Sequence, residues 1–123
     1  MNMNAPSFPA PSLLLVEDNP MDLDLTLRAF ERKRFANRID VARDGEEALA
    51  FMARWDAGEA PPAVILLDIN LPKVNGLEVL RQLKGHARYR RIPVVMLTSS
   101  REDRDLLAAY DLGVNSYIEK PVS

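Results

Sequence analysis

The chain has 123 residues, a formal net charge of −2 at pH 7 and no cysteine. This length fits one domain with a single core; the lack of cysteine excludes disulfide frameworks and thiolate metal sites, and the small net charge gives no general attraction to nucleic acid or anionic membranes. No apolar run approaches the roughly 20 residues that a membrane-spanning helix needs, so we expect a soluble protein, with the cytoplasm as the default location.

The first segment, "MNMNAPSFPAPS" (residues 1–12), holds three prolines and no charged side chain. This composition predicts a disordered leader. The prolines interrupt the continuous apolar stretch that a secretory signal needs, so the leader does not resemble one. We interpret residues 13–123 as one domain without internal repeats.

The first half of the domain alternates between strand and helix patterns. The apolar run in residues 12–18 predicts a strand. Residues 19–33 predict a helix, because they begin with an asparagine N-cap and a proline at the first helical position and carry apolar residues on one face. Residues 38–43 alternate as a short strand, and residues 44–55 have the apolar spacing of a second helix.

The second half continues the alternation. The stretch "AVILLDINLP" (residues 63–72) predicts a central strand that ends at an aspartate. A helix is expected at 76–84, a buried strand at 92–98, a helix at 99–113 and a short strand at 116–120. Five strands alternating with four helices are typical of βαβ units, so the expected fold class is α/β with a parallel sheet.

The predicted strands are apolar along their length and become polar only at their carboxyl ends. Strands buried on both faces have this pattern. In open α/β sheets, ligands bind outside the carboxyl ends of the strands. These ends supply Glu17, Asp18, Asp68, Thr98 and Lys120, so Asp68 is predicted to be an active-site carboxylate at the end of a central strand.

This set of residues indicates a particular chemistry. Three acids at one edge would raise one another's pKa unless a cation lies between them, and oxygen ligands of this kind suit Mg²⁺. A carboxylate can also act as a nucleophile toward phosphorus and form an aspartyl-phosphate. Mg²⁺, Lys120 and the Thr98 hydroxyl could stabilise the charge on the transferred phosphoryl group.

Five motifs in order carry a resemblance to a known family: "LLLVEDN", "VILLDINLP", the "NG" that follows it, "VVMLTSS" and "SYIEKP". Together, from Leu13 to Pro121, they resemble the response-regulator receiver domains of bacterial two-component systems, which are CheY-like. The resemblance implies a doubly wound, five-stranded parallel sheet with the flavodoxin-like strand order 2-1-3-4-5.

The resemblance also implies a role for each residue of the acidic set. Asp68 would accept a phosphoryl group from the phosphohistidine of a histidine kinase. Asp18 would bind Mg²⁺ or Mn²⁺ directly, Glu17 would act through water, and Asn70 would offer its backbone carbonyl. The domain would catalyse its own phosphorylation and dephosphorylation and would not be an enzyme acting on a separate substrate.

Four further residues take roles from the same resemblance. Lys120 would pair with the acceptor or its phosphate, and Thr98 would be the switch hydroxyl. Tyr117 would change rotamer when that hydroxyl moves, which would alter a protein-interaction surface; packing in a core or interface is the alternative for Tyr117. The bond between Lys120 and Pro121 would be a cis peptide, which proline tolerates.

The length and the "DLG-N-Y--KPV" ending look most like small single-domain regulators that partner phytochrome-type histidine kinases. Receivers normally carry a fifth helix after the "KP" segment, and this sequence ends at Ser123 without one. We therefore expect an apolar patch on the sheet face beside the first helix. Either a partner, including a second copy in a homodimer, or the rest of a longer chain would cover it.

Other interpretations stay open at this point. A phosphohydrolase with an aspartate nucleophile is disfavoured, because the position of its general acid holds Asn70. A constitutive pseudo-receiver or a phosphate sink remains an alternative. The only histidine, His86, is predicted to be exposed and without a role. The basic residues around it have no groove-reading helix and predict a solvated loop, which argues against nucleic-acid binding. These basic residues are Lys84, Arg88, Arg90 and Arg91.

Overall fold

The computed structural model describes residues 11–98, 103–120 and 122, with only the backbone described in 103–106. The elements in chain order are β1 (Leu13–Val16), α1 (Pro20–Arg32), β2 (Ile39–Ala42), α2 (Gly45–Asp56), β3 (Val64–Asp68), α3 (Gly76–Gly85), the 3-10 helix η1 (Tyr89–Arg91), β4 (Val94–Thr98), α4 (Asp103–Asp111) and β5 (Ser116–Glu119).

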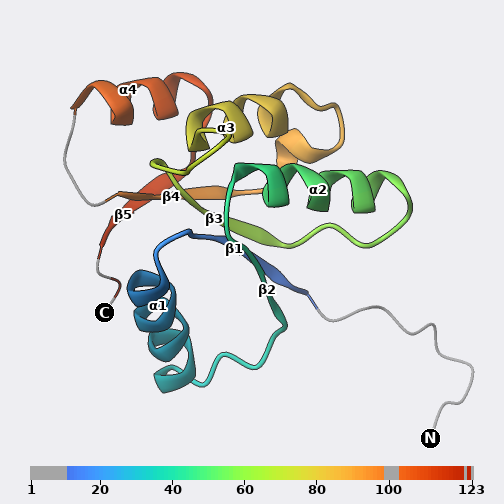
Figure 1. The fold of residues 1–123 in the computed structure, drawn as a ribbon. Helices are drawn as coiled ribbons and strands as arrows, with labels where there is room; N and C mark the ends of the chain where they lie inside the picture. The colour runs from blue at the N-terminus through green and yellow to red at the C-terminus, as the bar shows by residue number, and fades with distance from the viewer. Residues whose placement is uncertain (1–10, 99–102, 121, 123) are drawn as a thin grey trace, which may run out of the picture.

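The five strands form one parallel sheet in the order β2-β1-β3-β4-β5. Helix α1 covers one face, and α2, α3 and α4 lie on the other (Figure 1). The predicted fold class, strand order and alternation are confirmed. The short helix η1 was not predicted, and the expected start of the last helix, residues 99–102, lies outside the described residues. No helix in the described ranges is long and apolar enough to cross a membrane.

Side-chain caps start the first three helices, each of which follows the carboxyl end of a strand. The Asn19 side chain accepts from the backbone N–H groups of the second and third residues of α1 at 2.9 and 3.1 Å. Asp44 caps α2 by accepting from the Glu47 N–H at 2.8 Å, and Asn75 caps α3 at 2.8 Å. Each cap satisfies an N–H group that the helix leaves unpaired. Because the strands are parallel, the helices that follow them begin from the same edge of the sheet.

The core is divided by the sheet into two layers. Alternate strand side chains point to opposite faces, so Leu14 and Val16 pack with the α2–α3 side while Leu13 and Leu15 pack with the α1 side. All four are at most 3% exposed. Burial on both faces explains why the strands are apolar along their whole length.

The α1 side of the sheet is the less completely covered. A groove of about 400 Å³ lies there, bounded by apolar residues of α1, β1, β3, β5 and the segments that flank them. Its lining includes Leu13, Phe30, Phe35, Leu66, Ile118 and Val122. On β5, the last strand of the sheet, Ile118 lies in this lining and is 38% exposed. The apolar patch expected beside the first helix is therefore present.

Candidate functional site at the carboxyl edge of the sheet

Asp68, the last residue of β3, is buried at the carboxyl edge of the sheet and is 2% exposed. Its Oδ1 accepts from the Asn70 backbone N–H at 2.9 Å. The following loop folds back so closely that a Cβ on Gly76 would lie 2.1 Å from the Asp68 carbonyl oxygen. Glycine at position 76 thus lets the start of α3 pack against the backbone of the candidate acceptor.

Two acids from the neighbouring strand lie beside Asp68. Glu17 and Asp18 follow β1, which pairs with β3. Oxygen atoms of Glu17, Asp18 and Asp68 all lie within 4.8 Å of one another. Glu17 is fully buried, whereas Asp18 is exposed. Three carboxylates at this spacing form a donor set that fits a hard divalent cation such as Mg²⁺ or Mn²⁺.

The Lys120 side chain brings a positive charge into this group and is 8% exposed. Its Nζ donates to Asp68 Oδ2 at 2.8 Å and to Glu17 Oε1 at 3.0 Å. It also lies 2.9 Å from Asp22 Oδ2 in the first turn of α1. The Lys120 backbone N–H donates to the Thr98 carbonyl at 2.7 Å, which fixes this residue directly after β5.

The crowding shifts the pKa values of two groups in the cluster. Burial raises the pKa of Glu17 most; the neighbouring Asp68 raises it further, to about 7, against the opposing effect of Lys120. Burial alone would lower the pKa of Lys120, but its hydrogen bonds to Asp68, Asp22 and Glu17 outweigh burial and leave the pKa raised. The ammonium is therefore charged at neutral pH, and Glu17 is close to its point of titration.

The residues expected to form the switch lie on adjacent strands. Thr98 ends β4 and is 2% exposed. Tyr117 on β5 pairs with Met96, and Thr98 pairs with Glu119. Residues two apart on a strand share a face, so Tyr117 and Thr98 lie on the same face of the sheet. Pro121 lies outside the described residues, and the cis peptide expected there stays a prediction.

Asp22 is a residue of the site that the sequence analysis missed. The sequence places it in the first turn of α1, where an acid is ordinarily explained by the helix dipole. The one available signal in the sequence is that Asp22 lies only four residues after Asp18. The helix that carries Asp22 therefore starts beside the acidic cluster, where Asn19 caps it. No sequence pattern links it to Lys120, 98 positions further along the chain.

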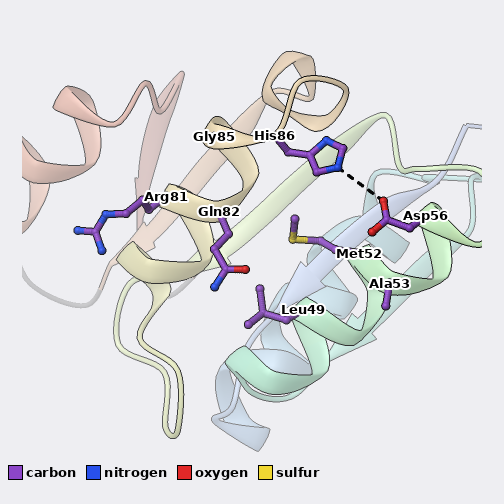
Figure 2. A pocket seen from close by; sticks show the side chains of 8 residues that line it. All are labelled: Leu49, Met52, Ala53, Asp56, Arg81, Gln82, Gly85 and His86. Atoms are coloured by element: carbon purple, nitrogen blue, oxygen red, sulfur yellow. Dashed lines mark ion pairs between the residues drawn. The ribbon is translucent and has the colours of Figure 1, made fainter.

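A second hollow, of about 500 Å³, lies between α2 and α3 (Figure 2). Leu49 and Met52 line its apolar side, Arg81 and Gln82 line the α3 side, and Asp56 lies at one end. Among the residues that the structure describes, the one cluster of three acids suited to a metal is at the sheet edge. We therefore take the sheet edge as the candidate site.

The predicted exposure of His86 is wrong. Its side chain is about one-third exposed, and its ring stacks on Tyr89 with the centroids 3.9 Å apart. Nδ1 accepts from the Arg88 N–H at 3.1 Å, and Nε2 lies 3.6 Å from Asp56 Oδ1 (Figure 2). Tyr89 is 1% exposed and its hydroxyl donates to Asp56. Because Tyr89 is buried in η1, the His86 ring that stacks on it packs against the protein and is partly covered.

The basic segment is also less free than predicted. Lys84 Nζ donates to the carbonyls of Arg90 and Ile92 at 3.2 and 3.1 Å, and Arg88 Nη2 lies 3.3 Å from Asp56 Oδ1. These side chains hold the connection between α3 and β4 in place, so two of the four basic residues have a structural role.

Comparisons with known proteins agree with this fold. Residues 13–123 match the family described as response regulator receiver domain. A protein described as "Probable methanogenesis regulatory protein FilR2", from Methanothrix harundinacea, is 50% identical over 112 residues, which are 90% of this chain and 72% of that protein. The structure of the bacteriophytochrome response regulator AtBRR is 53% identical with a TM-score of 0.83, over 93% of this chain and 84% of that one.

A third relative has been solved with a metal. Response regulator Rcp1 from Synechocystis sp. is 39% identical over 120 residues, covering 96% of this chain and 82% of that protein. Its Mn²⁺-bound crystal structure matches with a TM-score of 0.82 and 38% identity, over 89% of this chain and 81% of that one. A divalent metal therefore occurs in a relative whose fold this chain shares.

Proposed function

The chain belongs to the response regulator receiver domain family of two-component signalling, and from this premise we propose that Asp68 accepts a phosphoryl group from the phosphohistidine of a histidine kinase. An Asp68 carboxylate oxygen forms a bond to phosphorus as the N–P bond to histidine breaks, and the imidazole leaves. The observation that carries the proposal is the convergence of Glu17, Asp18 and Lys120 on this one buried carboxylate.

The acids of the cluster would hold Mg²⁺ or Mn²⁺, with Asp18 and Asp68 as direct ligands, Glu17 acting through water and Asn70 offering its backbone carbonyl. The close spacing of the three carboxylates supports this assignment, as does the Mn²⁺-bound structure of Rcp1. The cation would shield the negative charge of the phosphoryl oxygens from the carboxylates.

Lys120 and Thr98 would act on the phosphoryl group itself. The Lys120 ammonium already donates to Asp68 Oδ2 and can redirect that hydrogen bond to a phosphoryl oxygen. Thr98 ends the next strand, and its hydroxyl would turn toward the same group. Tyr117 would then change rotamer on β5. We expect Thr98→Ala to accept phosphate but to lose the change in hydrogen exchange that phosphorylation causes in α4 and β5.

The partner we propose is a cytoplasmic histidine kinase of the phytochrome type, because AtBRR is a bacteriophytochrome response regulator. The signal would leave through protein contacts made by the altered α4–β5 surface, and that surface carries exposed Leu107, Tyr110, Tyr117 and Ile118. A phosphate sink, which accepts phosphate without changing that surface, is the alternative.

The proposal is tested by incubating the protein with acetyl phosphate and Mg²⁺ and measuring its intact mass. We expect an increase of one phosphoryl group, which EDTA abolishes and which alkaline or hydroxylamine treatment reverses, because an acyl phosphate is labile. If the mass does not change while an established receiver is labelled in the same solution, the proposal is wrong and the chain is a constitutive pseudo-receiver.

A further inference from the structure

The Lys120 ammonium has three N–H donors, and three carboxylates surround it. Its Nζ lies 2.8 Å from Asp68, 2.9 Å from Asp22 and 3.0 Å from Glu17. Each donor therefore has an acceptor before any phosphoryl group arrives. A phosphoryl group on Asp68 must compete for this ammonium with carboxylates that already hold it.

The three carboxylates differ in what else they do. Asp68 is the proposed acceptor, and Glu17 belongs with it to the group whose oxygens lie within 4.8 Å of one another, of which Asp22 is not a member. The Glu17 side chain is 0% exposed and that of Asp68 2%, whereas that of Asp22 is 25% exposed. The Asp22 carboxylate is thus placed to bind the lysine from outside the metal cluster.

Capping does not explain the position of the Asp22 carboxylate. The helix α1 is capped by the Asn19 side chain, to which Asp22 contributes only its backbone N–H. Its carboxylate points instead to the charge of Lys120, which lies beyond the end of β5. This contact joins the first turn of α1 to the residue that would bind the phosphoryl group.

We propose that Asp22 is a positioning residue that competes with a phosphoryl group on Asp68 for the Lys120 ammonium. The competition lowers the affinity of the site for that group. The inference rests on the proposed function. With Asp22 present, the ammonium shares its charge between a permanent carboxylate and the incoming phosphoryl oxygens. Without it, a donor and more of the positive charge are available to those oxygens.

The test compares the affinity for beryllium fluoride, a small phosphoryl mimic, at saturating Mg²⁺ in three proteins: wild type, Asp22→Asn and Asp24→Asn. Asparagine keeps the size of the side chain and removes its charge. Asp24 is the matched control, because it lies on the same helix but pairs with Arg28 at 3.0 Å. We expect Asp22→Asn to bind the mimic about three- to tenfold more tightly, a modest gain because a partly exposed ion pair is screened by water.

Calorimetry with Mg²⁺ alone supplies a second readout. Competition for Lys120 predicts that Asp22→Asn changes Mg²⁺ affinity no more than Asp24→Asn does. A general loosening of the site would instead weaken both metal and mimic. A third variant, Asp22→Glu, keeps a carboxylate and is expected to bind the mimic as the wild type does, so that the gain in Asp22→Asn is assigned to the lost charge and not to any change at this position.

Two results would overturn the inference while leaving the proposed function intact. In the first, Asp22→Asn binds the mimic no more tightly than wild type. In the second, Asp24→Asn tightens binding equally, so that net charge alone accounts for the effect. If the wild type binds no mimic and takes no phosphoryl group from acetyl phosphate, the proposed function itself has failed, and the inference with it.

Discussion

Asp44 and Asp68 are both buried carboxylates at or just after the carboxyl ends of strands of the same sheet, with 9% and 2% of their surfaces exposed. The carboxylate oxygens of Asp44 cap the following helix and pair with a surface lysine. Its Oδ1 accepts from the Glu47 N–H, and its Oδ2 lies 3.4 Å from the exposed Lys73 ammonium. The hydrogen bond from the Glu47 N–H is the main reason that the pKa of Asp44 is below its ordinary value.

Asp68 has partners from distant parts of the chain. Glu17 and Asp18 reach it from the end of β1, and Lys120 from the end of β5. The strand order explains the difference, because β3 is central whereas β2, which precedes Asp44, is at an edge. Burial at a strand end is therefore not enough to make a site; the convergence of charges from several strands distinguishes Asp68 from Asp44.

The largest difference between the two aspartates is expected in phosphoryl acceptance. Asp68→Asn should abolish labelling by acetyl phosphate, because the amide is nearly the same shape but is a poor nucleophile. Asp44→Asn should be labelled as the wild type is. Intact mass after a fixed incubation measures both. Equal loss of labelling in the two variants would mean that Asp68 has no special role.

The next effect concerns the metal. Asp18→Ala should weaken Mg²⁺ binding by about tenfold or more, since it removes a charged oxygen ligand. The same change should raise the melting temperature in EDTA, because it relieves repulsion among three crowded acids. Melting curves with and without Mg²⁺ check both effects. A lower melting temperature in EDTA would contradict the idea that the cluster is strained.

The two regions should also respond oppositely to pH. The pKa of Glu17 is raised from 4.5 to about 7 in the folded protein, so between these values the folded state binds more protons than the unfolded state. Without metal, the free energy of unfolding should therefore fall as pH rises through this window, by on the order of 3 kcal/mol. Above pH 7 this contribution should be level.

Asp44 has the opposite sign. Its pKa is lowered in the folded state, so its stabilising contribution is present above its ordinary pKa and is lost as pH falls through the lowered one. Chemical unfolding in EDTA, from below pH 3.8 up to pH 7, separates the two contributions, with Glu17→Gln and Asp44→Asn as the matched variants. The account is contradicted if Glu17→Gln leaves the fall between pH 4.5 and 7 unchanged.

The smallest effect is on the helix cap. Asp44→Ala should lower the free energy of unfolding by about 1 kcal/mol, because α2 loses the acceptor for an N–H group of its first turn. Asp44→Asn should cost less, since asparagine is also a good N-cap. Urea unfolding measures the difference. Labelling of Asp68 should be unaffected in both variants, and a loss of labelling would show that the β2–α2 turn contributes to the site.

The sequence was sufficient to predict the elements and the meeting of Glu17, Asp18, Asp68 and Lys120, because parallel strands place all their carboxyl ends at one edge. It did not reveal Asp22, since the contact between α1 and Lys120 depends on how the helix is rotated over the sheet. It also misplaced His86, whose position follows from the burial of Tyr89 in a short helix that has no periodic pattern.

The most direct test is to locate the phosphoryl group. The protein is labelled with acetyl phosphate and Mg²⁺, the acyl phosphate is reduced with borohydride, and the modified residue is identified by peptide mass spectrometry. We predict reduction at Asp68 alone, and none when EDTA replaces Mg²⁺. Modification at Asp44 or another carboxylate, or labelling that does not require a divalent metal, would contradict the claim that the charges converging on Asp68 make it the acceptor.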